Sequence, residues 1–114
     1  MQLNSQKIVE TTTLTTSLGG LDIPLLTITN FKNKQVQVET NKKVIVITGR
    51  VHPGESNASY LMHGFLQFIL SSDKSANELR NKYIFKIIPM INPDGVAIGN
   101  NRTSFLGRDL NRTY

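Results

Sequence analysis

Two residues with metal-binding side chains, His52 and Glu55, stand close together in the stretch RVHPGES, residues 50–56. They are separated by Pro-Gly, a dipeptide that turns the backbone sharply and can bring both side chains to one point. An imidazole nitrogen and a carboxylate oxygen both bind zinc at about 2 Å. The HxxE spacing is a weak indication by itself, because a loop histidine beside a glutamate at the start of a helix has the same pattern. The elements around the pair must therefore decide whether it predicts a metal site.

The pair follows the most apolar run of the chain. Residues 43–51, KVIVITGRV, are nearly continuous in Val and Ile, which is typical of a central strand buried on both faces of a sheet. Residues 56–70 carry apolar side chains at helical spacing, with Ser56 or Asn57 suited to cap the helix. Residues 84–92, IFKIIPMIN, predict another buried strand, and the NPDG that follows predicts a turn.

A buried strand, helical segments and a second buried strand predict a right-handed crossover unit. Further strands are expected at 7–17 and 21–31, a polar turn-like segment at 33–43, and a loop with a short helix at 72–83. We therefore expect an α/β fold with a mixed, largely parallel sheet and flanking helices. Ligands of such sheets bind beyond the carboxyl ends of the strands, so the HxxE and NPDG turns should converge on one rim.

Composition narrows the class of protein. The chain has 114 residues, enough for one domain, with 39% hydrophobic and 18% charged residues. It has no cysteine, which excludes a disulfide framework, Cys-ligated zinc and a thiol nucleophile. The formal net charge of +5 favours anionic partners, although the basic residues are dispersed and ordinary surface charge explains them equally well. No signal-peptide core or membrane span is apparent, so we expect a cytoplasmic protein or a fragment of one.

Three motifs in series, VIVITGRVHPGES, IIPMINPDGV and GRDLNR, resemble the zinc carboxypeptidase family, most closely its cytosolic carboxypeptidase branch. The resemblance runs from about Leu14 to Tyr114 and implies a zinc-carboxypeptidase-like fold with Zn²⁺ as cofactor. It implies hydrolysis of C-terminal residues, glutamate in many members of this branch, from proteins such as tubulin. The expected partners are acidic peptide or protein C-termini, with neither nucleic acid nor a membrane, and the expected location is the cytoplasm, in association with the cytoskeleton.

The resemblance also implies roles for individual residues of the metal centre. His52 and Glu55 match the two zinc ligands of the family's HxxE pair. Asp109, in GRDLNR, resembles the aspartate that accepts a hydrogen bond from the zinc-bound histidine and fixes its tautomer. The other histidine, His63, is predicted to lie opposite the apolar stripe of its helix, which favours a surface role.

Substrate-binding roles are implied for three polar residues near the C-terminus. Asn111 and Arg112 match the pair that holds the substrate's terminal carboxylate, for which the planar fork of an arginine is suited. Arg102 best matches the arginine that polarises the scissile carbonyl and stabilises the oxyanion. Arg102, Arg108 and Arg112 are equally compatible with solvated loop charges, and Asp94 of NPDG fits a turn-former better than a catalyst.

The family places a third zinc ligand, a histidine, and a catalytic glutamate downstream of the Asn-Arg pair. Neither follows within this chain, so we expect residues 1–114 to be the N-terminal portion of a catalytic domain, incomplete and inactive alone. Two alternatives remain open. One is a zinc amidohydrolase of the aspartoacylase and succinylglutamate desuccinylase group, although HPGES and NPDGV favour the peptidase. The other is a non-catalytic module that binds peptide C-termini through Asn111 and Arg112.

Overall fold

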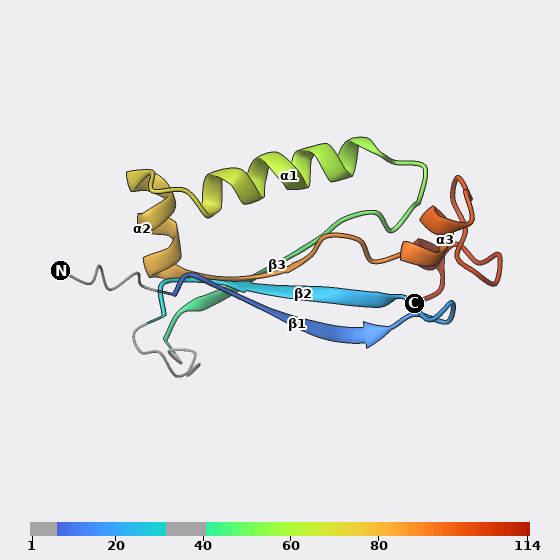
Figure 1. Ribbon diagram of the computed structural model, residues 1–114, viewed down its shortest axis with the longest axis horizontal. Coiled ribbons are helices and arrows are strands. Elements are labelled where there is room, and N and C mark those ends of the chain that lie inside the picture. The colour runs from blue at the N-terminus through green and yellow to red at the C-terminus, as the bar shows by residue number, and fades with distance from the viewer. Residues whose placement is uncertain (1–6, 32–40) are drawn as a thin grey trace.

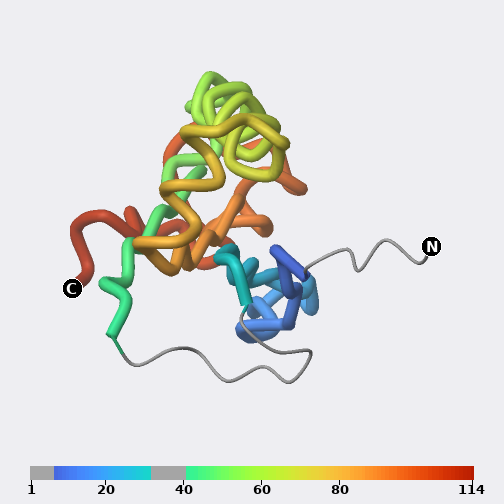
Figure 2. Tube along the Cα trace, turned by 90° about the vertical axis from the view of Figure 1, so that its left-hand side faces the viewer, coloured from blue at the N-terminus to red at the C-terminus, as the bar shows by residue number. Residues whose placement is uncertain are grey.

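The computed structural model describes residues 7–31 and 41–114. These residues form a four-stranded sheet with helices on one side (Figure 1). Helices α1 and α2 lie together on the same side of this sheet in both views (Figure 2). No helix among these residues is long and apolar enough to cross a membrane. In chain order the elements are β1 (Val9–Thr16), β2 (Asp22–Ile28), β3 (Lys43–Thr48), α1 (Asn57–Ile69), α2 (Lys74–Lys82), β4 (Tyr83–Ile88), α3 (Pro93–Ala97) and the 3₁₀ turn η1 (Leu110–Arg112).

The sheet is mixed, with strand order β1-β2-β4-β3. β1 pairs with β2 and β2 with β4 in antiparallel fashion, whereas β3 and β4 are parallel from Lys43–Tyr83 to Thr48–Ile88. The two helices α1 and α2 connect the parallel strands, as the predicted crossover requires. The mixed α/β sheet with flanking helices is thus confirmed, although only one of the pairings in the described ranges is parallel.

The prediction that residues 43–51 form a central strand is wrong for the described part of the chain. β4 is central, with Ile84 and Ile87 fully buried, while β3 lies at the edge and exposes Val44 by 56% and Val46 by 64%. Successive side chains of a strand point to opposite faces. Ile45 and Ile47 of β3 pack against the core, so the Val side chains face the side of the sheet away from α1.

The core lies between α1 and the sheet. Met62 of α1 is buried there, and Phe65 meets Phe85 of β4 edge to face with ring centroids 5.7 Å apart. His63 is exposed, as predicted. Leu61, one of the apolar residues of the predicted helix 56–70, is 76% exposed. It lines the open side of the contact between α1 and β3.

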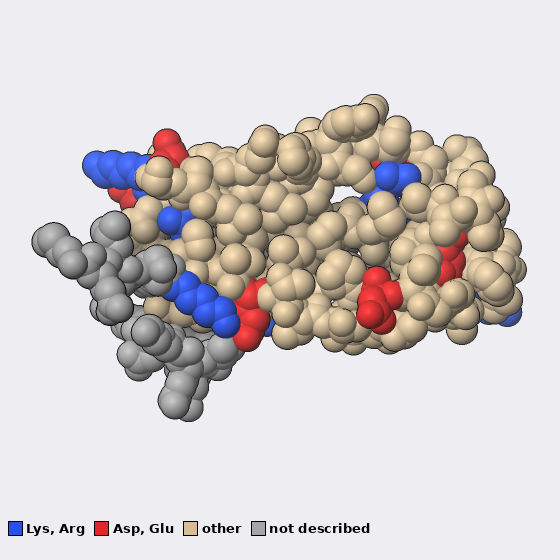
Figure 3. All heavy atoms as spheres, in the orientation of Figure 1, with Lys and Arg blue, Asp and Glu red and all other residues tan. Residues whose placement is uncertain are grey.

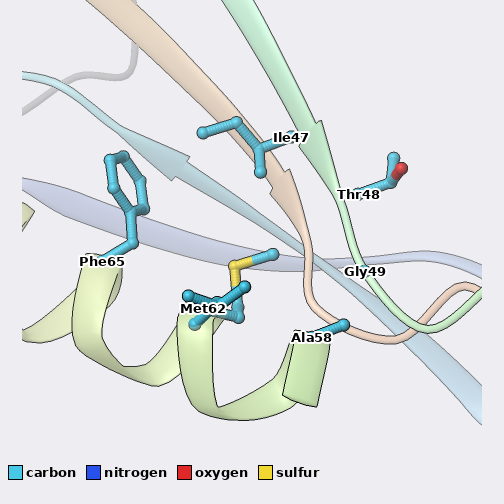
Figure 4. Close-up of a pocket in the computed structure, with 7 residues that line it drawn as sticks. Ile47, Thr48, Gly49, Ala58, Met62 and Phe65 are labelled. Carbon is cyan, nitrogen blue, oxygen red and sulfur yellow. The ribbon is translucent and has the colours of Figure 1, made fainter. Parts of the chain in front are cut away.

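The close-up of Figure 4 shows the contact between α1 and the end of β3. Met62 and Phe65 point from the helix towards Ile47, and Ala58 lies next to Gly49 at the end of the strand (Figure 4). These side chains, with Leu61, line an open cavity of about 320 Å³ that is almost entirely apolar. The packing fixes the start of α1 relative to the end of β3, and the HxxE turn lies between them.

The loops that carry the sequence motifs begin earlier than the sequence indicates. β3 ends at Thr48 and β4 at Ile88, each a few residues short of its predicted end. NPDG is not a simple turn but opens α3, because Pro93 suits the first helical turn and the Asn92 side chain accepts a bond from the Gly95 backbone at 3.0 Å. Most of the predicted polar segment 33–43 lies outside the described residues.

Candidate metal site

The two predicted zinc ligands face each other across the Pro-Gly turn. Glu55 N–H donates to the His52 carbonyl at 3.2 Å, which closes the turn. Nδ1 of His52 lies 3.0 Å from Oε1 of Glu55. The imidazole is buried, with 7% of the residue exposed, whereas the Glu55 side chain is 62% exposed. Both atoms are of types that bind zinc at about 2 Å, and the Glu55 side of the pair is open to solvent.

Asp109 holds the other nitrogen of the imidazole. Its Oδ1 lies 3.0 Å from His52 Nε2 and also accepts from the Asn111 backbone N–H at 3.0 Å. Its Oδ2 accepts from Arg102 Nε at 2.7 Å. Burial is the largest single influence on the Asp109 pKa and raises it, but the bonds from His52, Asn111 and Arg102, with the Arg102 charge, together lower it below its ordinary value. Asp109 is therefore ionised and joins the histidine to an arginine.

The predicted substrate-binding residues lie around this aspartate. Arg102, with its side chain half exposed, bonds within the described residues only through Nε, so its terminal NH₂ groups are directed to solvent. Asn111 and Arg112 belong to η1, directly after Asp109. The Arg112 guanidinium donates to the Asn111 carbonyl at 3.0 Å, and the Asn111 side chain accepts from the Tyr114 hydroxyl at 3.2 Å. The structure brings the named residues to one end of the sheet, and their roles in binding stay predictions.

One buried residue, Asn92, joins the loops that carry the site, and sequence reasoning gave it no such role. It is 2% exposed, and its amide nitrogen donates to the carbonyls of Val51, next to His52, at 3.1 Å and of Thr103, next to Arg102, at 3.4 Å. No spacing rule in the sequence indicates these partners, because both are backbone atoms of distant segments.

Asp94, the next polar residue of NPDG, anchors a different segment. It is buried and accepts from Ser17 Oγ at 2.7 Å and from Gly19 N–H at 3.0 Å. The turn between β1 and β2 is thereby tied to the start of α3. Asp94 thus has a structural role, which agrees with its interpretation as a residue of a turn.

The residues present fit part of a zinc centre. Zinc is usually four-coordinate, with three protein ligands in a catalytic site. His52 Nδ1 and Glu55 Oε1 are candidates for two of them, and the second nitrogen of His52 has the carboxylate partner that ligating histidines usually have. Within residues 7–31 and 41–114, no three His, Asp or Glu side chains are placed to hold one ion. The described part of the chain therefore offers two candidate ligands and not three.

Charged side chains are sparse on the face shown in Figure 3. Lys and Arg side chains appear at both ends of the molecule and do not form one patch there, and most of the face is uncharged (Figure 3). The net charge of +5 is accordingly spread over the chain. This distribution gives no support to a large anionic partner bound on this face.

The sequence of the chain is similar to that of a known protein family. The sequence profile described as "Zinc carboxypeptidase" matches residues 1–114. The chain is 55% identical over 102 residues to Cytosolic carboxypeptidase 2 of Xenopus tropicalis, which covers 90% of this chain and 10% of the relative. The chain thus spans about a tenth of the length of such curated relatives.

Solved structures agree with this likeness. A putative carboxypeptidase A from Shewanella denitrificans superposes with a TM-score of 0.81 at 36% identity, over 95% of this chain and 27% of that one. An aspartoacylase family protein from Mesorhizobium loti superposes with a TM-score of 0.65 at 20% identity, over 96% of this chain and 31% of that one, and shares the fold alone. The zinc carboxypeptidase profile matches the whole length of the chain, and the curated carboxypeptidases are more similar to it in sequence than the aspartoacylase family protein is. The chain therefore belongs to the zinc carboxypeptidase family.

Proposed function

We propose that this chain forms part of the active site of a zinc-dependent carboxypeptidase that removes C-terminal glutamate from acidic protein tails such as those of tubulin. The observation that carries the proposal is the environment of His52. One ring nitrogen faces Glu55 and the other faces Asp109, each at 3.0 Å. This is the arrangement that a zinc-binding histidine needs, because its free nitrogen must be unprotonated and its other nitrogen must have an acceptor.

His52 and Glu55 would hold the ion, which supplies Lewis-acid activation of a carbonyl and of water when bound. With the ion bound, Asp109 would accept the Nε2 proton of His52 and leave Nδ1 unprotonated as the ligand. Arg102, held at Nε by the same aspartate, keeps its terminal NH₂ groups for an oxygen that gains negative charge. Asn111 and Arg112 would bind the terminal carboxylate of the substrate.

An acidic substrate is supported by charge and by likeness. Arg102 and Arg112 both lie in the C-terminal segment that carries the site. The curated relatives are named cytosolic carboxypeptidases. We propose a cytoplasmic location because these relatives are named cytosolic.

The test exploits the identity to the relative from Xenopus tropicalis. The matched 102 residues of that protein are replaced by the corresponding residues of this chain. The chimera, loaded with zinc, should release free glutamate from a peptide that ends in several glutamates. The same peptide with an amidated C-terminus should give no release.

The matched control carries Glu55→Gln, which keeps the size of the side chain and removes its charge. The isolated 114-residue chain should be inactive, because its described residues supply only two metal ligands. A folded, zinc-loaded chimera that releases no glutamate, beside an active parent protein, would overturn the proposal.

A further inference from the structure

Arg50, two residues before His52, has an unusual backbone conformation. Its φ is 56°, and it is the single non-glycine residue of the described ranges with a positive φ. Residues with a Cβ meet steric repulsion in this left-handed region, which costs free energy. Glycine would avoid the cost, so an arginine here indicates that its side chain has a use. Strain of this kind is frequent at functional sites.

The guanidinium of Arg50 folds back over the turn that carries the metal ligands. Nε donates to the Pro53 carbonyl at 3.0 Å and Nη2 donates to the same oxygen, while Nη1 donates to Ser59 Oγ at 2.8 Å. Pro53 precedes Glu55 in the turn, and Ser59 follows it in the first turns of α1. One side chain therefore links the backbone before Glu55 to the helix after it.

Few other side-chain bonds brace this segment. Ser56, at the N-cap of α1, makes no side-chain capping bond. The turn is also held by backbone bonds, from Gly54 N–H to the Asn101 carbonyl at 2.7 Å, from Ser56 N–H to the Gly54 carbonyl at 2.9 Å and from Ala58 N–H to the Glu55 carbonyl at 3.0 Å. These bonds hold the turn and its junction with α1, whereas the Arg50 side chain joins Pro53 directly to Ser59 within the helix. An arginine is suited to such a link, because its rigid fork can donate to two acceptors in different directions.

We propose that Arg50 is a positioning residue that holds the His52–Glu55 turn in its metal-binding geometry. It touches neither the reacting atoms nor the ion, and it acts through the Pro53 carbonyl and the Ser59 hydroxyl. The inference rests on the proposed zinc function, so its test includes a measurement that needs no metal.

The experiment compares the 114-residue chain with Arg50→Gly, Arg50→Lys and Ser59→Ala, using Arg108→Gly as the matched control. Arg108 is exposed, and its side chain makes no hydrogen bond within the described structure. Calorimetric titration with Zn²⁺ should show affinity about tenfold weaker for Arg50→Gly, the range seen when groups behind metal ligands are removed. Arg50→Lys should recover part of it, Ser59→Ala should lose about threefold because one of the two anchors remains, and the control should match the wild type.

The metal-free measurement is amide hydrogen exchange followed by NMR. In Arg50→Gly the amide of Glu55 should exchange at least about tenfold faster, as local opening becomes easier. The amide of Ile87 in β4 should be unchanged, and the melting temperature should not fall, because glycine relieves the positive φ. A merely structural role would lower the melting temperature and leave zinc affinity proportional to the folded fraction.

Each outcome either supports or refutes the positioning role of Arg50. Wild-type exchange at Glu55 together with wild-type zinc affinity in Arg50→Gly would overturn the proposal. If the wild-type chain binds no zinc while exchange at Glu55 still rises in Arg50→Gly, two ligands are too few to hold the ion in the isolated chain, and the positioning role stands on the exchange measurement. If Arg50→Gly does not fold, Arg50→Lys and Ser59→Ala provide the same two measurements, and no change in either variant would refute the role.

Discussion

The imidazole of His52 and the carboxylate of Asp109 are joined at 3.0 Å across 57 positions of sequence. His52 lies just beyond β3, and Asp109 stands directly before the 3₁₀ turn η1. The carboxylate has two further partners, the Asn111 backbone and Arg102, so its orientation is fixed independently of the histidine. The ring is thereby held between two carboxylates, with Nε2 placed to donate to Asp109 when Nδ1 binds a metal.

Asp109→Asn tests whether the bond between Asp109 and His52 increases the affinity of the site for zinc. An amide cannot accept from His52, Asn111 and Arg102 with both of its ends, because one end is itself a donor. Zinc affinity of the 114-residue chain should fall by about tenfold or more. Asp22→Asn, an exposed change in β2, is the control and should leave affinity unchanged. Equal affinities for the two variants would contradict a role for Asp109 behind the metal.

The pH dependence of stability should depend on Asp109. Its pKa is lowered from the ordinary value of 3.8 in the folded chain. A carboxyl group whose pKa is lowered by folding binds protons more readily in the unfolded chain. Its contribution to the free energy of unfolding is therefore complete above the unfolded pKa of about 4. The contribution is lost as the pH falls through the lower, folded pKa.

Urea unfolding of the wild type and of Asp109→Asn should therefore show a constant stability difference above about pH 5 that narrows in more acid solution. The comparison between the two proteins at each pH removes the effect of other carboxyl groups. A difference that widens towards low pH would show that the carboxylate is not stabilised by its partners.

Local sequence patterns predicted the elements well and the strand positions less well. The Val/Ile run of 43–51 and the apolar run of 84–92 both form strands, and α1 occupies the segment predicted for it. Which strand is central could not be predicted, because both runs are apolar and only pairing decides. β4 pairs on both edges, whereas β3 has one partner within the described residues.

The site was predictable where a motif names its residues and not where backbone atoms provide the contacts. The motifs indicated His52, Glu55 and Asp109, and the structure brings them within hydrogen-bonding distance. The Asn92 amide nitrogen and one side of the Arg50 guanidinium donate to carbonyl oxygens, which every residue type has. Sequence spacing carries no information about such partners, so only the folded geometry shows them.

Asn92→Ala should destabilise the fold and loosen the site together. The change leaves the Val51 carbonyl and the Gly95 N–H without the Asn92 side chain, while the Thr103 carbonyl keeps its bond from the Asn100 amide. Unsatisfied buried groups of this kind cost about 1–3 kcal/mol, so the free energy of unfolding should fall by roughly 2–3 kcal/mol. Chemical denaturation measures it, with the exposed Asn57→Ala as control. Similar small losses in both variants would show that the bonds of Asn92 are dispensable.

Two glycines with different surroundings should respond oppositely to alanine. A Cβ at Gly95 would overlap the Pro53 ring and lie 2.6 Å from the Thr103 carbonyl, so the HxxE turn or the Arg102 loop must move. Gly64, in α1, has nothing within 4 Å of the same atom. Gly95→Ala should lower the free energy of unfolding by about 1–3 kcal/mol, whereas Gly64→Ala should raise it by about 0.5–1 kcal/mol. Thermal unfolding of both variants measures this, and a neutral Gly95→Ala would mean that the turn has room to shift.

Substitutions of Arg102 and of Arg112 should change different kinetic constants of the active chimera. Arg102 is held at Nε by Asp109, so its free NH₂ groups have a fixed position from which to stabilise a developing oxyanion. Arg102→Ala should lower kcat by about 100–1000-fold, the usual effect of losing such a donor. Within the described residues the Arg112 side chain bonds only to the Asn111 carbonyl and is exposed, which suits a group that binds the carboxylate equally in substrate and transition state. Arg112→Ala should therefore raise KM and leave kcat nearly unchanged. Steady-state glutamate release over a range of peptide concentrations measures both constants. A KM effect from Arg102→Ala with kcat intact would mean that it binds the carboxylate instead.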